Sequence, residues 1–197
     1  MFWYEEEVQA LEKKVKAGSI ADSPVVFYGS SSIRLWTTLA QDFPQYNTLN
    51  LGFGGSTLAA CAWFFDRLVV PANPKSIIFY AGDNDLGDGR HVEEVYLFFC
   101  ALTQKLQRQL PDVPLTFMAI KPSPARWAIV DRIRYANELI RKEIARYPHC
   151  HYVDSHTPML SAACGPRPEL FQADGLHLNA KGYALWREVL LKHPHIF

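Results

Sequence analysis

Net charge is the first thing that this sequence lacks, because its 20 lysine and arginine residues balance its 20 aspartate and glutamate residues. A chain without a basic excess has no general attraction for nucleic acid or for an anionic membrane surface. The sequence also lacks an apolar run long enough to span a bilayer, and residues 1–7 have neither the basic region nor the apolar core of a signal peptide. We therefore expect a cytoplasmic protein that binds neither nucleic acid nor membrane.

Cysteine is scarce, and the four cysteines that are present show no C-x-x-C spacing. A chain of 197 residues is large enough to be stable without disulfides. The histidine pairs at 149 and 151 and at 193 and 195 lack the i, i+4 spacing with a nearby carboxylate that is typical of helical metal ligands. We therefore expect no metal site and no cofactor.

Hydrophobic residues are abundant, at 49% of the chain, and they fall into short apolar runs that alternate with amphipathic segments. The runs predict strands over residues 25–28, 46–51, 76–81, 115–120 and 151–154. The amphipathic segments predict helices over about 4–17, 58–68, 92–106, 133–147 and 182–191, the first ending at Gly18. Residues 121–127, with two prolines, predict a stiff loop.

This alternation of strands and helices is typical of right-handed βαβ crossovers. The predicted fold class is α/β, a three-layer α/β/α sandwich with a five-stranded parallel sheet. We expect a single domain over residues 1–197, with an N-terminal helix at 1–18 packed on it. The distinctive residues follow the first three strands or precede the last helix, and all four loops would open on one edge of the sheet.

The first of these loops carries the sequence Gly-Ser-Ser-Ser at 29–32, between a buried strand and the start of a helix that would include Trp36. Glycine allows the sharp turn, and serine side chains can cap a helix. A serine at this edge can also attack a substrate once a base removes its proton. The sequence at this point leaves both interpretations open.

Asp174 and His177, before the last helix, are spaced so that the carboxylate can reach Nδ1 of the imidazole and leave Nε2 facing a serine. The alternative is that Asp174 only caps the last helix. Gly55 can offer a backbone N–H and Asn84 a side-chain amide to an oxyanion, although both residue types are also common in plain turns.

Taken together, four ordered blocks carry a resemblance: Gly-x-Ser at 29–31, Asn-x-Gly-x-x-Gly at 50–55, Gly-x-Asn-Asp at 82–85 and Asp-x-x-His at 174–177. The chain resembles the SGNH/GDSL hydrolase family from about residue 24 to residue 190. The resemblance implies the flavodoxin-like SGNH hydrolase fold. It also implies Ser31 as nucleophile, His177 as general base, Asp174 as its orienting partner, and the N–H of Ser31 with Gly55 and Asn84 as oxyanion donors.

One position departs from the family's pattern, because Ser30 stands where the first block usually has an aspartate. That aspartate is not the triad acid, so we expect its loss to affect the turn or the rate rather than the type of reaction. The register of the block selects Ser31, and we expect Ser32 to start the helix.

We therefore expect a serine esterase that acts on a small-molecule ester, with short acyl groups, acetate on a sugar or another alcohol, as the first choice. The apolar residues expected to line its pocket are Phe53, Leu86, Pro122 and Trp127. A homo-oligomer is compatible with the sequence.

Three alternatives remain at this stage. A thioesterase or lysophospholipase would act on longer acyl chains. A flavodoxin-like electron carrier would bind the phosphate of FMN in the serine-rich loop at 29–32, and the purified protein would then be yellow. A pseudoenzyme would keep the pocket only to bind a ligand or a partner, as the serine at position 30 suggests.

Overall fold

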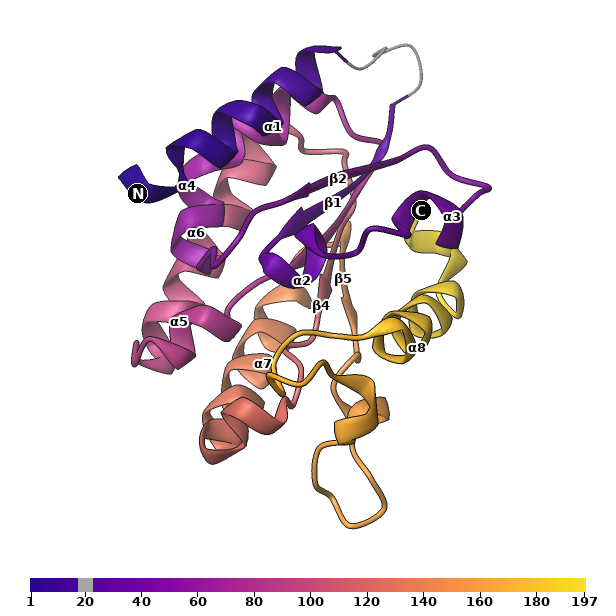
Figure 1. Ribbon diagram of the computed structural model, residues 1–197. Helices are drawn as coiled ribbons and strands as arrows, with labels where there is room; N and C mark the ends of the chain where they lie inside the picture. Colours follow the sequence, from indigo (N-terminus) through magenta and orange to yellow (C-terminus); the bar gives the residue numbers. More distant parts are fainter. Residues whose placement is uncertain (18–22) are drawn as a thin grey trace.

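The computed structural model describes residues 1–17 and 23–197, and its centre is a five-stranded parallel sheet (Figure 1). The strand order is β2-β1-β3-β4-β5. The strands are β1 (Val25–Gly29), β2 (Thr48–Gly52), β3 (Ser76–Tyr80), β4 (Leu115–Met118) and β5 (Cys150–Val153). The predicted number and type of strands are therefore confirmed, with boundaries that shift by up to two residues.

Helices cover both faces of the sheet, which confirms the three-layer α/β/α architecture (Figure 1). Along β1 the side chains alternate between the two layers: Val26 and Tyr28 join one core, and Val25 and Phe27 join the other. The first core is covered by α1 (Glu5–Ala17), α4 (Leu58–Leu68), α6 (Val92–Gln109) and α7 (Val130–Ile144). The second is covered by α3 (Leu39–Asp42) and α8 (Ala180–Leu191).

The serine-rich loop leads into a single helical turn, α2 (Ser31–Arg34), so the predicted helix through Trp36 is wrong in its length. The side chain of Asn50 donates a hydrogen bond to the carbonyl of Ile33 at 2.6 Å, and Trp36 N–H donates to the same carbonyl at 3.0 Å. Because these bonds take up a carbonyl that a longer helix would use, the chain turns away. Trp36 is then buried against aromatic rings of the second core, including Tyr183 and Trp186 of α8.

Several short elements were not predicted. The helix α5 (Asp83–Gly87) follows β3, and a 3-10 helix, η3 (Pro124–Ile129), occupies the second half of the expected stiff loop. The other 3-10 helices are η1 (Phe2–Tyr4), η2 (Val70–Ala72), η4 (Thr157–Met159), η5 (Pro168–Leu170) and η6 (Pro194–Ile196). The expected helix end at Gly18 lies outside the described residues. Among the helices of the described segments, none is long and apolar enough to cross a membrane.

The sheet order makes the carboxyl ends of β1 and β3 the switch point of the fold, because the chain leaves β1 for β2 on one side and returns to β3 on the other. Gly29 sits at this point with a φ of +137°. A Cβ added there would lie 1.8 Å from the carbonyl oxygen of Tyr80. Only glycine allows the two strand ends to approach this closely.

We predict that Gly29→Ala is more destabilising than Gly89→Ala, which is a matched control because Gly89 also has a positive φ, +91°, but no atom near an added Cβ. Gly89→Ala carries only the backbone strain, about 1–3 kcal/mol. Gly29→Ala must also separate two strand ends, and we expect an additional loss of roughly 2 kcal/mol in the free energy of unfolding. Urea unfolding of both variants measures the difference, and equal midpoints would contradict the prediction.

Candidate active site

Ser31 is the first residue of α2 and is the only one of the three adjacent serines whose side chain is more than marginally exposed. Ser30 and Ser32 are each 2% exposed, whereas Ser31 is half-buried. Ser30 precedes the helix without a capping bond from its side chain. The helix begins at Ser31, so the expectation that Ser32 starts it was wrong. The Oγ of Ser31 lies 3.1 Å from Nε2 of His177.

His177 is held from its other side by Asp174, with Oδ2 of the carboxylate 2.6 Å from Nδ1 of the ring. The second oxygen, Oδ1, accepts hydrogen bonds from the backbone N–H of Leu176 at 2.9 Å and of His177 at 3.0 Å. These bonds, first that from Leu176 and then that from the imidazole, lower the pKa of Asp174 to about 2. Because the ionised carboxylate only accepts, Nδ1 carries the proton of the neutral ring and Nε2 faces Ser31 with a lone pair.

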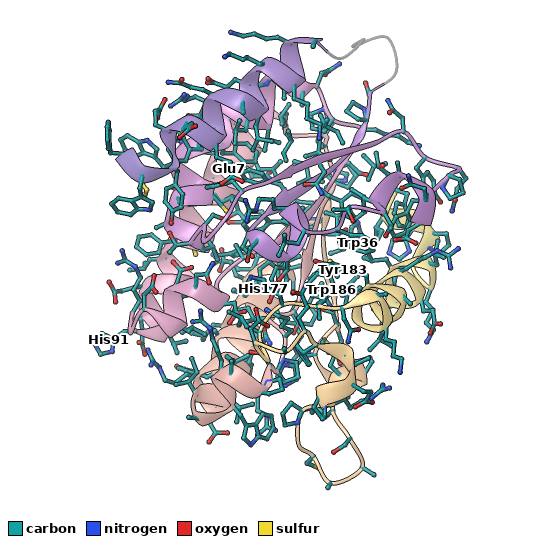
Figure 2. The ribbon with its side chains drawn as sticks, viewed as in Figure 1. Glu7, Trp36, His91, His177, Tyr183 and Trp186 are labelled. Atoms are coloured by element: carbon teal, nitrogen blue, oxygen red, sulfur yellow. The ribbon has the colours of Figure 1, made fainter. Side chains whose placement is uncertain are left out.

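Asp174 does not cap the last helix, so that alternative is excluded. The cap of α8 is Asn179, whose side chain accepts hydrogen bonds from the N–H groups of Lys181 and Gly182. The loop that carries Asp174 and His177 is instead fixed by backbone contacts, including Ala125 N–H to the Gly175 carbonyl at 3.0 Å. In the view of Figure 2, His177 lies near the middle and His91 at the margin.

Three groups are free to donate hydrogen bonds to an oxyanion beside Ser31. The N–H of Ser31 opens a helix, and Gly55, with a φ of +63°, carries its N–H in a loop where nothing lies within 4 Å of an added Cβ. Among the residues that the structure describes, neither N–H has an acceptor. Asn84, on α5, donates one hydrogen of Nδ2 to the Ser56 carbonyl at 3.0 Å and has a second one left.

The N-terminal segment supports the glycine loop, a role that was not predicted. The hydroxyl of Tyr4 donates to the Gly55 carbonyl at 3.0 Å, and the carboxylate of Glu7 accepts from Gly54 N–H at 2.8 Å. Glu7, which Figure 2 labels on α1, also pairs with Arg34 at 3.3 Å. The only sequence signal was that Tyr4 begins an amphipathic stripe, which indicates burial and gives no information about the hydroxyl.

Two of the four residues expected to line a substrate pocket lie in the core. Phe53 and Leu86 are 0% and 1% exposed, and the ring of Phe53 packs edge-on against Tyr4. Apolar residues in these short loops turn inward because that removes their surface from water. Pro122 is also buried. Trp127 is half-buried beneath the guanidinium of Arg134 and remains a candidate for the pocket.

In the described part of the chain, no group of three histidine, cysteine, aspartate or glutamate side chains is placed to hold a metal ion. Of the cysteines, Cys61 and Cys150 are buried and Cys164 is exposed, and all four are free thiols. Burial raises the pKa of the Cys150 thiol to about 11. The arrangement that can do chemistry is therefore the hydroxyl, imidazole and carboxylate around Ser31.

Comparison with known proteins agrees with this geometry. A sequence model of the GDSL-like lipase/acylhydrolase family matches residues 18–185. The chain belongs to this family. It is thus an acylhydrolase, a carboxylic ester hydrolase, and the interpretations as an electron carrier and as a pseudoenzyme are set aside.

The known proteins that resemble this chain are distant from it in sequence. The human platelet-activating factor acetylhydrolase IB subunit alpha1 is 26% identical over 171 residues, which cover 81% of this chain and 70% of the relative. A GDSL-like lipase from Bacteroides thetaiotaomicron has a similar structure, with a TM-score of 0.79 at 17% identity over 94% of this chain and 95% of the other. A lipase/acylhydrolase from Enterococcus faecalis gives a TM-score of 0.70 at 17% identity over 86% and 94%. The two structures show a shared fold.

We predict that Asp174→Asn lowers kcat by about 10²–10⁴-fold, because an amide in place of Oδ2 donates to Nδ1 and forces the proton onto Nε2. The matched control is Asp154→Asn. The carboxylate of Asp154 accepts from the N–H groups of His156 and Thr157 in the same kind of turn, away from Ser31. Initial rates on an activated ester compare the two variants at neutral pH, where the wild-type carboxylate is fully ionised. Similar rates in both variants would contradict an orienting role for Asp174.

Proposed function

We propose that this protein is a serine esterase that hydrolyses short-chain acyl esters, acetyl esters first, through a covalent acyl-enzyme. The observation that carries the proposal is the chain of contacts from Ser31 Oγ to His177 Nε2 at 3.1 Å and from His177 Nδ1 to Asp174 at 2.6 Å. A hydroxyl next to the basic nitrogen of an oriented imidazole is the arrangement that nucleophilic acyl transfer requires.

In the first half of the reaction, Ser31 Oγ attacks the carbonyl carbon of the ester while His177 Nε2 takes its proton. The oxygen that becomes negative is stabilised by the N–H groups of Ser31 and Gly55 and by the amide of Asn84. The bond to the alcohol then breaks, and the imidazolium of His177 returns its proton to the leaving oxygen.

In the second half, a water molecule gives a proton to His177 and attacks the acyl group on Ser31. Collapse of the second tetrahedral intermediate releases the carboxylic acid, and Ser31 regains its proton from His177. Throughout both halves the carboxylate of Asp174 stabilises the imidazolium that forms.

A short acyl group is supported by the surroundings of Asn84 and by the names of the relatives. The residue before Asn84 is Asp83, which forms a buried ion pair with Lys121, and Phe53 and Leu86 are enclosed in the core. The residues beside the proposed oxyanion donors thus include a charged pair. They do not form the open apolar channel that a long acyl chain would need. The curated relatives are named acetylhydrolases.

We predict that Ser31→Ala loses at least about 10³-fold in kcat on an activated acetate ester, because no other group can form the acyl-enzyme. Ser32→Ala is the matched control, since it removes the neighbouring hydroxyl but leaves the backbone contacts of α2. A fluorophosphonate should add its mass to the peptide that contains residue 31 in the wild type and in Ser32→Ala, and not in Ser31→Ala. Wild-type activity in Ser31→Ala would refute the mechanism.

We also predict that activity falls with acyl length. Along a series of p-nitrophenyl esters from acetate to decanoate, kcat/KM should drop by at least about tenfold between butyrate and octanoate, because each added methylene needs apolar space. A maximum at octanoate or decanoate would instead favour the alternative, a thioesterase or lysophospholipase that acts on long acyl chains.

A further inference from the structure

Arg126 lies in η3, in the connection that follows β4. Its guanidinium packs against α5, the helix that carries Asn84. Gly87 leaves room for the guanidinium, because an added Cβ would lie only 0.8 Å from Nη1 of Arg126. The guanidinium is largely buried, because the side chain is 17% exposed. A charged group in this position requires partners that compensate for its lost hydration.

All three nitrogens of the guanidinium have such partners, and all of the partners belong to the two residues that open α5. Nη1 donates to the Asp83 carbonyl at 2.9 Å, and Nε lies 3.3 Å from the Asp83 carboxylate. Nη2 donates to Oδ1 of Asn84 at 3.2 Å. The planar, forked shape of the guanidinium fits these positions in a way that an ammonium group cannot.

The contact of Arg126 with Oδ1, together with the Ser56 carbonyl that accepts from Nδ2, determines which way the amide of Asn84 faces. If the amide were turned over, its NH2 group would face the guanidinium, and two donors would oppose each other. With Oδ1 on Arg126, one hydrogen of Nδ2 is bound to the Ser56 carbonyl at 3.0 Å. The other hydrogen is then available to the oxyanion.

Asp83, the residue before Asn84, binds a second cation besides Arg126. The carboxylate of Asp83 also accepts from Lys121 Nζ at 2.5 Å, in a pair whose side chains are 4% and 1% exposed. The pKa of Lys121 stays above its ordinary value, because the Asp83 carboxylate outweighs the lowering that burial alone would cause. Two cations thus share one carboxylate next to Asn84. Asp85, the other carboxylate of α5, faces away and accepts from Leu58 N–H at 2.6 Å.

We propose that Arg126 is a positioning residue of the oxyanion hole, which orients the amide of Asn84 and polarises it toward the substrate oxygen. The inference rests on the proposed function and deepens it. A hydrogen bond from a cation into Oδ1 draws electron density from the amide and makes Nδ2–H a stronger donor as negative charge develops. The neighbouring residue Ala125 also holds the Gly175 carbonyl of the His177 loop, so one short segment contacts both halves of the site.

The test is a double-mutant cycle between Arg126 and Asn84 on an activated acetate ester. We expect Asn84→Ala to lower kcat by about 10²–10³-fold and Arg126→Ala by about 10²-fold. Because Arg126 acts through Asn84, the double variant should be within about threefold of Asn84→Ala. If the fold-loss in kcat of the double variant equals the product of the two single losses, the inference is overturned. Such a result would mean that Arg126 affects the structure in general and does not act through the amide of Asn84.

Conservative variants separate orientation from charge. Arg126→Lys keeps the charge without the fork and should remain at least about tenfold below the wild type in kcat, with a change in KM under about threefold. Millimolar guanidinium should restore part of the kcat of Arg126→Ala and none of that of Ser31→Ala. Arg108→Ala, which removes an exposed guanidinium from α6, is the control and should keep wild-type kcat. Wild-type kcat in Arg126→Lys would overturn the inference.

Two further results keep the test decisive. If Arg126→Ala does not fold, Gly87→Ala takes its place. The methyl group of the new alanine occupies the position of Nη1 of Arg126, while the arginine stays in the chain. An unchanged kcat in a folded Gly87→Ala overturns the inference. Loss of activity in Ser31→Ala together with wild-type kcat in Arg126→Ala refutes the role of Arg126 and leaves the proposed function standing. Full activity in Ser31→Ala refutes both.

Discussion

The hydrogen bond from Ser30 N–H to the Tyr80 carbonyl, 3.0 Å long, is the contact on which the site depends. It joins the ends of β1 and β3 at the switch point of the sheet, and it forms only because Gly29 has no Cβ to meet the same carbonyl. The chain turns out of the sheet at this place, so that Ser31 becomes the first residue of a helix with its N–H free. The proposed nucleophile and one proposed oxyanion donor are thus positioned by a single backbone approach.

The loops around Ser31 are too short to contain cores of their own, and hydrogen bonds to carboxylates hold them in place. Two of these carboxylates, those of Asp174 and Asp85, have pKa values that shift in opposite directions. Asp174 is half-exposed, and the groups that donate to it lower its pKa to about 2, whereas burial raises the pKa of Asp85. The first remains a full negative charge beside His177 and suits the stabilisation of an imidazolium. The second receives the N–H of Leu58 at the start of α4 and thereby fixes the loop that contains Gly55.

The sheet and the contacts of the proposed catalytic residues were predictable, because buried parallel strands leave continuous apolar runs, and these residues either follow the first three runs or precede the last helix. The relation of Asp174 to His177 is local, three residues apart, so the spacing allows the contact, and the resemblance of the four blocks favours it over a helix cap. The supports of the site were not predictable. Tyr4 is 51 residues from Gly55 and Arg126 is 42 residues from Asn84, and no local pattern indicates that such pairs meet. Phe53 and Leu86 were assigned to a pocket because residue type alone does not distinguish a core side chain from a pocket wall in a short loop.

Position 30 shows how a site can lose a charged residue of its family's pattern and keep its geometry. The contributions of Ser30 that the structure shows are made by its backbone, because its N–H donates to the Tyr80 carbonyl and its carbonyl accepts from the N–H groups of Ile33 and Arg34. Any residue except proline supplies both groups. The side chain of Ser30 is 2% exposed, and a carboxylate at this depth would need compensating donors. In this chain the buried carboxylates are instead those of Asp83 and Asp85 on either side of Asn84, and Lys121 and Arg126 compensate that of Asp83. Buried negative charge therefore stands on the side of Asn84, and the proposed mechanism assigns no step to a charge at position 30.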